Sequence, residues 1–250
     1  MKPTVSVKNF SLTLGGKDIV HKLNFEVQPG EVFAFLGANG SGKTSTIRSL
    51  IGLYEATNGT LHVNGRQYSA KDAQTLGYLP EERGLYTRVS AIDNLTYFGE
   101  MKGLTRAEAR KAGMEFLEEV GLADKANLKL KKLSGGQQQK VQLGVAVMGN
   151  PSLLILDEPT KGLDPVNRKL LLDIVDQHKQ QGASVIYITH LMEEVERLAD
   201  RLLIIKNGKA EAYGTVSEVK KKFKAKSIEE VFVGIYNEEP SSVVKKKEVA

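Results

Sequence analysis

Cysteine is absent from the 250-residue sequence, which can therefore form neither a disulfide framework nor a thiolate metal site. This absence suits a reducing compartment, so we expect a cytosolic location. Long hydrophobic runs are also missing, because the apolar segments VFAFL, LLIL, SVIYI and RLLII are far shorter than the ~20 residues of a membrane-spanning helix. The N-terminus alternates apolar and polar residues and lacks the charged start and apolar block of a signal peptide. We therefore expect no segment to cross a membrane.

The residues that are present are typical of an ordinary globular protein. Hydrophobic residues make up 41% and charged residues 26%, which excludes disordered and collagen-like classes. The length suits one large domain or one domain with subdomains. The net charge of +5 is mild, and much of it comes from Lys220, Lys221, Lys222, Lys224, Lys226, Lys245, Lys246 and Lys247. These lysines are interpreted either as a solvated helix and tail or as a contact with anionic lipid headgroups.

The pattern of apolar residues predicts an α/β fold. TVSVKNFSLTL and LNFEV alternate as strands do, and TLHVNGRQY predicts a hairpin that turns at Asn64-Gly65, so we expect an antiparallel sheet near the N-terminus. The short runs VFAFL, LLILD, SVIYITH and RLLIIK lack alternation, as is typical of parallel strands covered on both faces. Helical segments between these runs complete a core with a largely parallel sheet.

A helical region, at about 83–150, separates the runs VFAFL and LLILD. Within it, Thr105 and Glu108 form a capping-box pattern, and Gly121 supplies a C-terminal stop. A later helix is predicted to begin with Asp164 as its N-cap and to end before Gly182.

The stretch GANGSGKT matches the pattern G-x-x-x-x-G-K-[ST] and lies between an apolar strand and a helix. Its residues are Gly37, Ala38, Asn39, Gly40, Ser41, Gly42, Lys43 and Thr44. The glycines allow a sharp turn whose N–H groups approach phosphate oxygens, and the helix N-terminus adds partial positive charge. Lys43 would reach the β- and γ-phosphates, and Thr44 would give its hydroxyl to Mg²⁺. The alternative is a glycine-rich turn that contains Lys-Thr by chance.

A second segment supplies acids for the same site. LLILDEPT is an apolar strand that ends in two acids, of which Asp157 would reach the metal and Glu158 would lie beside the γ-phosphate. Two solvated acids at a strand end are the alternative, but that interpretation leaves their occurrence with a phosphate loop unexplained.

A third segment, LSGGQQQKV, begins a helix at Ser134, Gly135 and Gly136, so its free N–H groups form a second anion site. The order GANGSGKT, LSGGQQQKV, LLILDEPT resembles the Walker A, signature and Walker B motifs of ATP-binding cassette (ABC) ATPases. Glu81 lies at the Q-loop position of that family, GLD at the D-loop, and His190 after the strand SVIYIT.

The resemblance covers residues 2 to 235 and implies the P-loop NTPase fold of the ABC ATPase type. The expected organisation is one ABC ATPase domain over 1–235 and a lysine-rich tail over 236–250. Within the domain we expect a mostly parallel core sheet, an N-terminal antiparallel β-subdomain, and a helical subdomain at about 83–150 inserted in the RecA-like core.

The resemblance also implies ATP hydrolysis with Mg²⁺. Glu158 would polarise the attacking water, His190 would contact the γ-phosphate, and Lys43 would complete the catalytic set. The metal would be held by Thr44, Asp157 and Glu81. Nucleotide contacts would come from the phosphate loop, Ser45 and Leu14.

Family likeness further implies partners. Ser134, Gly135, Gly136 and Gln137 would close over the nucleotide of a second subunit, in a homodimer or a related heterodimer with two ATPs at its interface. The segment GYLPEERGLYTRVSAIDNL is similar to that of nucleotide-binding subunits of multi-subunit export-type transporters. We therefore expect an integral membrane permease as partner, a peripheral location on the cytoplasmic face of the membrane, and no nucleic acid.

Leu85, Tyr86 and Val89 are candidates for the groove that receives a short helix of the permease, or they are ordinary core residues. A soluble ABC ATPase acting in nucleic-acid or assembly processes is the alternative function. A switch that binds nucleotide without cleaving it conflicts with the presence of Glu158.

Three positions depart from the family pattern. Glu81 stands where glutamine is usual, which adds negative charge beside a polyphosphate. Leu14 stands where many subunits stack an aromatic residue on adenine, so adenine selectivity is expected to be loose. Lys161 replaces the usual small polar residue at the start of the D-loop, with no effect that the sequence explains.

Overall fold

The N-terminal region forms an antiparallel sheet in the computed structural model, which describes residues 2–82 and 84–237. Its strands, in the order β2-β1-β4, are β1 (Val5–Leu14), β2 (Lys17–Val27) and β4 (Asn58–Val63). Alternate side chains of β1, such as Val5 and Val7, are buried, so one face of the sheet packs on the core. The predicted antiparallel N-terminal sheet is confirmed.

The predicted hairpin at Asn64-Gly65 is confirmed at its turn, but its second strand does not continue past Arg66. Both residues have positive φ and form the expected turn, but Arg66 makes only a single bridge to Val63. The partner of β4 is β1. After the turn, Asp72 accepts a hydrogen bond from the Ser69 N–H, and the chain enters a short 3-10 helix, η1 (Ala70–Thr75). The capping interactions of Asp72 therefore direct the chain away from a second strand.

The core sheet is largely parallel, as predicted. In the described residues it has six strands in the order β5-β6-β7-β3-β8-β9. They are β3 (Val32–Leu36), β5 (Leu76–Leu79), β6 (Leu153–Asp157), β7 (Ser184–Ile188), β8 (Arg201–Lys206) and β9 (Lys209–Thr215). All pairs are parallel except β8 with β9. Because β6, β7 and β3 are neighbours, the segments that follow their carboxyl ends meet at one edge of the sheet.

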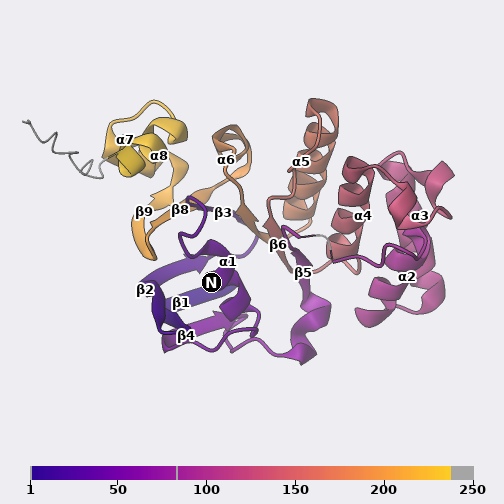
Figure 1. Cartoon of the computed structure of the whole chain (residues 1–250), viewed down its shortest axis with the longest axis horizontal. Helices are drawn as coiled ribbons and strands as arrows, with labels where there is room; N and C mark the ends of the chain where they lie inside the picture. Colours follow the sequence, from indigo (N-terminus) through magenta and orange to yellow (C-terminus); the bar gives the residue numbers. More distant parts are fainter. Residues whose placement is uncertain (1, 83, 238–250) are drawn as a thin grey trace, which may run out of the picture.

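Three helices lie together at one end of the molecule, on the right of Figure 1: α2 (Ala91–Met101), α3 (Arg106–Glu119) and α4 (Gly135–Val147). Short 3-10 turns, η2 (Ala123–Lys125) and η3 (Leu130–Lys132), connect α3 to α4. Thr105 caps α3 with Glu108 in a capping box, and Gly121 has a φ of 69° just past the helix end, as predicted. Arg83, where the predicted helical region begins, lies outside the described residues.

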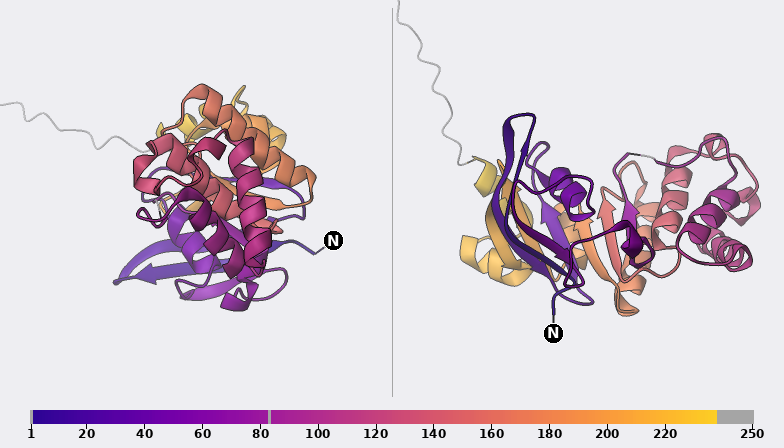
Figure 2. Two further views of the ribbon diagram at one scale, coloured as in Figure 1. Left: turned by 90° about the vertical axis from the view of Figure 1, so that its right-hand side faces the viewer. Right: turned by 90° about the horizontal axis from the view of Figure 1, so that it is seen from below.

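The remaining helices flank the core sheet. They are α1 (Lys43–Leu50), α5 (Pro165–Gln180), α6 (Met192–Leu198), α7 (Val216–Phe223) and α8 (Ile228–Asn237). Asp164 caps α5 as predicted, by accepting the N–H groups of Val166 and Asn167. The two C-terminal helices lie at the opposite end of the molecule from α2, α3 and α4 (Figure 2). Within the described ranges, no helix combines the length and the apolar character needed to span a bilayer.

The last helix overlaps the predicted tail. Residues 236 and 237 end α8, although the sequence placed them in a tail over 236–250. The rest of that tail, including Lys245, Lys246 and Lys247, lies outside the described residues.

Candidate nucleotide site

The loop between β3 and α1 is shaped by its glycines. Gly40 and Gly42 have φ values of 77° and 107°, in the left-handed region that suits glycine. Gly37 is needed for a different reason, because a Cβ there would lie 2.5 Å from the carbonyl oxygen of Ile205 in β8. Gly42 is the N-cap of α1 and offers no side chain to its first turn. The helix therefore presents backbone N–H groups and partial positive charge to a ligand in the loop.

Lys43 lies across this loop. Its Nζ donates to the carbonyl oxygens of Gly37 at 2.7 Å and Ala38 at 3.1 Å. Burial lowers the pKa of the Lys43 ammonium, while nearby carboxylates act in the opposite direction. A cation beside a glycine-rich loop and a helix N-terminus favours a polyphosphate ligand.

Asp157 ends the buried strand β6 and is only 2% exposed. Its Oδ2 lies 3.5 Å from the hydroxyl oxygen of Thr44, at the first turn of α1. Burial, followed by the carboxylates of Glu81 and Glu158, raises the pKa of Asp157 to about 6. Carboxylates are thus concentrated in a buried, poorly hydrated part of the site, where a divalent cation would stabilise their negative charge.

The residues present fit a magnesium ion. Magnesium is usually bound by one or two carboxylates together with substrate phosphates and water. Asp157 and Glu81 supply carboxylates, and the Thr44 hydroxyl stands beside Asp157. Residues 2–82 and 84–237 contain no group of three or more His, Asp or Glu side chains placed to hold a metal by themselves.

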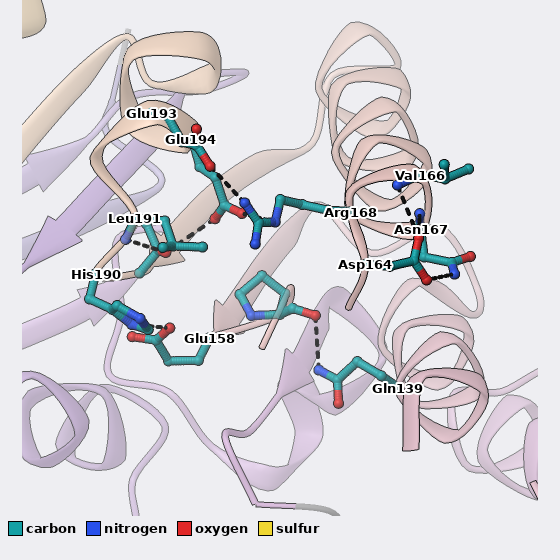
Figure 3. Close-up of polar contacts among 12 residues, drawn as sticks. Gln139, Glu158, Asp164, Val166, Asn167, Arg168, His190, Leu191, Glu193 and Glu194 are labelled. Carbon is teal, nitrogen blue, oxygen red and sulfur yellow. Dashed lines mark hydrogen bonds and ion pairs between the residues drawn. The ribbon is translucent and has the colours of Figure 1, made fainter. Parts of the chain in front are cut away.

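Glu158 faces His190 across the edge of the sheet (Figure 3). The Oε2 of Glu158 and the Nδ1 of His190 are 2.8 Å apart. The backbone of Glu158 has a φ of 51°, which is uncommon for a residue with a side chain, and its N–H donates to the Ile188 carbonyl oxygen at 2.9 Å. Strained backbone of this kind clusters at functional sites. The strand ends of β6 and β7 thus bring an acid and an imidazole together.

A buried acid that the sequence analysis missed anchors the segment carrying His190. Glu194, on α6, is 1% exposed and accepts hydrogen bonds from the hydroxyls of Tyr187 at 2.9 Å and Thr189 at 3.1 Å. The Thr189 hydroxyl accepts in turn from the Leu191 N–H at 3.0 Å. Arg168 of α5 lies near, with its Nε 3.7 Å from the carboxylate (Figure 3). This network fixes the backbone on both sides of His190.

Two glutamines of α4, also missed from the sequence, hold other parts of the site. The amide of Gln139 donates to the Pro159 carbonyl oxygen at 2.9 Å. The amide of Gln142 donates to the carbonyl oxygens of Pro80 at 2.9 Å and Glu82 at 3.3 Å. Buried amides with such partners are costly to remove, so α4 fixes the segments that follow β5 and β6.

These elements surround one cavity of about 400 Å³. Its lining consists of Ile19, Asn39, Gly40, Gly42, Lys43, Thr44, Ser45, Glu81, Asp157, Glu158, Lys161 and His190. Gly37, Ala38 and Ser41 lie in the same loop but outside the lining. Leu14 is also outside the lining, although it packs against the same core cluster as Ile19, which lines the cavity. The base contact expected of Leu14 stays a prediction, and Ile19, which lies beyond the turn at Gly15-Gly16 on β2, is a further candidate for it.

The expected signature residues lie apart from this cavity. Ser134 and Gly135 are exposed at the start of α4. The Ser134 hydroxyl accepts from the N–H of Gln137 at 3.3 Å, and the Gln137 side chain accepts from the Ser134 N–H at 3.0 Å. The serine thus caps its own helix and is exposed to solvent, and its contact with a nucleotide of a second subunit stays a prediction.

Tyr236 of α8 contacts the phosphate loop outside the cavity lining. Its hydroxyl accepts from the Ala38 N–H at 2.7 Å and donates to the carbonyl oxygen of Ile205 at 2.8 Å. Burial raises the pKa of this phenol, so it stays protonated and able to donate. The sequence contained no signal for this contact, which joins residues almost 200 positions apart.

Comparisons with known proteins agree with this geometry. The family model of ABC transporters matches residues 20–161. An uncharacterized ABC transporter ATP-binding protein of Methanocaldococcus jannaschii is 43% identical over 89% of this chain and 81% of its own length. The Nod factor export ATP-binding protein I of Cupriavidus metallidurans is 35% identical over 88% of this chain and 73% of its own length. A solved ATP-binding subunit of an ABC transporter matches with a TM-score of 0.87 and 30% identity, over 93% of this chain and 99% of that one.

Proposed function

The chain belongs to the ABC transporter family of ATP-binding proteins, and from this premise we propose that it hydrolyses ATP to power export through a separate membrane-spanning partner. One observation carries the proposal: a single cavity brings together the phosphate loop with Lys43, the buried Asp157, and the Glu158–His190 pair. The proposed unit is one ABC ATPase domain over 1–235, with a helical subdomain at about 83–150.

The loop and its lysine would bind the nucleotide. The N–H groups of the loop and of the first turn of α1 face the β- and γ-phosphates, and Lys43 adds its charge. Thr44, Asp157 and Glu81 would hold Mg²⁺, which when bound neutralises charge on the phosphate oxygens. Ile19 would offer an apolar surface to the base, without the stacking that an aromatic ring supplies.

Glu158 would position the attacking water. Its carboxylate accepts a hydrogen bond from the water, whose oxygen bonds to the γ-phosphorus as the bond to the β-phosphate oxygen breaks. ADP leaves with the electron pair of that bond, and the proton of the water goes to the released phosphate. His190 keeps the carboxylate in place through the 2.8 Å contact and lies beside the space for the γ-phosphate.

A second copy of the chain, or a related subunit, would complete each site. Ser134, Gly135, Gly136 and Gln137 are outside the cavity of their own chain, at the exposed start of α4. A helix N-terminus that faces solvent suits an anion carried by another molecule. This placement supports a two-fold dimer in which each signature segment covers the nucleotide of the other subunit.

The membrane partner would dock on α2. A hollow of about 430 Å³ there is lined by Tyr86, Val89 and Tyr97, among others. Tyr86 and Tyr97 are 53% and 44% exposed, and their rings are 5.5 Å apart. Exposed aromatic pairs of this kind are typical of interaction surfaces. Leu85, the third candidate from the sequence, packs instead against the helical core. We assign the hollow to a short helix of the permease. Two of its lining residues, Tyr86 and Val89, follow closely after Glu81 in the sequence, so a helix bound there could act on the segment that carries Glu81.

A relative supports the direction of transport, and the permease would determine where the chain lies in the cell. One relative is named for export of Nod factor, which favours export here. Binding to the permease would place the chain on the cytoplasmic face of the membrane, with no nucleic-acid partner. Contact of Lys220, Lys221 and Lys222 with anionic lipid stays a prediction.

Phosphate release from ATP tests the proposal. Purified chain should liberate inorganic phosphate in the presence of Mg²⁺, and Lys43→Ala should reduce the rate to background. Equal rates for the two proteins would show that the cavity is not the site of hydrolysis.

A further inference from the structure

Glu81 and Lys161 stand 80 positions apart in the sequence and meet at the rim of the cavity. The Oε1 of Glu81 and the Nζ of Lys161 are 2.7 Å apart. Each is the unusual residue of its segment, since the ABC ATPase family that the chain resembles usually has glutamine at the first position and a small polar residue at the second. Because they are in contact, the two unusual residues form one ion pair with opposite charges.

The backbone around each partner is fixed independently of the pair. Gln142 of α4 holds the carbonyl oxygens on both sides of Glu81. Gln139 holds the carbonyl of Pro159, and the N–H of Lys161 donates to the Glu158 carbonyl oxygen at 3.1 Å. Because both turns are anchored elsewhere, removal of the Lys161 ammonium should leave the backbone of the Glu81 segment in place, with the carboxylate still beside the cavity.

The pair contributes more to the charge of the site than to the stability of the fold. The side chains of Lys161 and Glu81 are 59% and 46% exposed, and an ion pair as exposed as this adds little to the stability of a fold. The cavity, however, holds three carboxylates, and Lys43 already donates to the loop carbonyls. An unpaired carboxylate at the rim would repel the triphosphate, whose charge is of the same sign.

We propose that Lys161 is a positioning residue that holds the Glu81 carboxylate at the rim and cancels its charge, so that the acid can serve the metal without repelling the triphosphate. Lys161 acts on the nucleotide through Glu81 and not by direct contact. This inference rests on the proposed nucleotide site and adds to it a reason why glutamate is tolerated in this position.

Binding of the fluorescent nucleotide mant-ATP to the full chain tests the pair without any need for turnover. In EDTA, Lys161→Ser should weaken binding about tenfold, the effect of one uncancelled charge at several ångströms in a partly solvated site. Lys161→Arg keeps the charge and should bind as the wild type does. With Mg²⁺ present the deficit of Lys161→Ser should shrink, because the cation then cancels the same carboxylate.

The double variant Glu81→Gln/Lys161→Ser decides how Lys161 acts. Under the proposal, removal of the acid restores the metal-free affinity of Lys161→Ser to within about threefold of the wild type. If the double variant binds as weakly as Lys161→Ser, the lysine contacts the phosphates itself and the proposal is wrong. Wild-type affinity in Lys161→Ser would also overturn it.

Two controls distinguish loss of the ion pair from loss of folding and from failure of the proposed nucleotide site. Thermal unfolding should show nearly equal midpoints for all four proteins, so that lost affinity is not lost folding. Failure of the wild type to bind mant-ATP at all would contradict the proposed nucleotide site itself, whereas failure of the rescue contradicts only the role of the pair.

Discussion

The Nδ1 of His190 lies 2.8 Å from the Oε2 of Glu158, at the adjacent ends of strands β7 and β6. We propose that through this contact the imidazole keeps the carboxylate of Glu158 directed toward the attacking water and the γ-phosphate. We expect His190→Ala to lower kcat by about 100-fold, within the usual range for a displaced acid–base group, and to change KM for ATP little. Steady-state phosphate release gives both constants. A large rise in KM with unchanged kcat would instead assign His190 to nucleotide binding.

Asp157→Asn should stabilise the protein without ligand. The folded pKa of about 6 exceeds the ordinary value of 3.8, so the folded state binds more protons than the unfolded state between these values. Stability is therefore lost as pH rises from about 4 to about 6, and the full penalty of about 2 to 3 kcal/mol applies above that range. Asparagine removes the charge and with it the penalty.

Urea unfolding at pH 4 and pH 7.5 measures this effect. The stability of Asp157→Asn should match that of the wild type at the lower pH and exceed it at the higher pH. The variant should also lose Mg²⁺-dependent phosphate release. A variant that is less stable at neutral pH would show that the carboxylate makes net favourable contacts.

Tyr236→Phe should weaken nucleotide binding, although Tyr236 contacts the phosphate loop outside the cavity lining. Loss of the hydroxyl leaves the Ala38 N–H and the Ile205 carbonyl oxygen without this partner, which should cost about 1 to 3 kcal/mol of stability. It should also raise the Kd for mant-ATP several-fold, because the loop is less well ordered before binding. Tyr213→Phe is the control, since that hydroxyl contacts the Arg201 guanidinium and the Glu26 N–H, which both lie outside the phosphate loop. Equal effects of the two variants on Kd would contradict a role for Tyr236 in the loop.

Tyr86→Ala with Tyr97→Ala should detach the chain from its membrane partner. Both rings line the hollow on α2 and are half exposed, so their removal should eliminate most of the apolar contact surface. Affinity purification from detergent-solubilised membranes measures the bound permease. Val233→Ala, a similarly exposed apolar position on α8, should leave the association intact. Undiminished recovery of the permease with the double variant would exclude the hollow as its docking site.

The sequence predicts those features that depend on local chemistry. The phosphate loop, the acids at the end of β6 and the caps at Thr105 and Asp164 each follow from a few adjacent residues, and the structure places them as expected. Buried parallel strands are also recognisable from their short apolar runs. Strand β5 was missed because four residues are too few to show a pattern.

Other features depend on contacts between distant residues. Gln139 belongs to the segment LSGGQQQKV and Gln142 follows it directly, yet the sequence does not reveal that they hold Pro159 and Pro80. Ile19 was missed because the chain reverses direction between β1 and β2, and sequence counting does not show which strand faces the cavity. Tyr236 and the Glu81–Lys161 pair are likewise visible only after folding brings the segments together.

One mass measurement decides whether two chains enclose the nucleotide between them. Glu158→Gln keeps the shape of the side chain but cannot polarise the water, so it should hold ATP and hydrolyse it slowly. With ATP and Mg²⁺, light scattering behind size exclusion should give twice the mass of one chain, and without nucleotide the mass of one chain. A monomer that carries bound ATP under the same conditions would contradict the dimer.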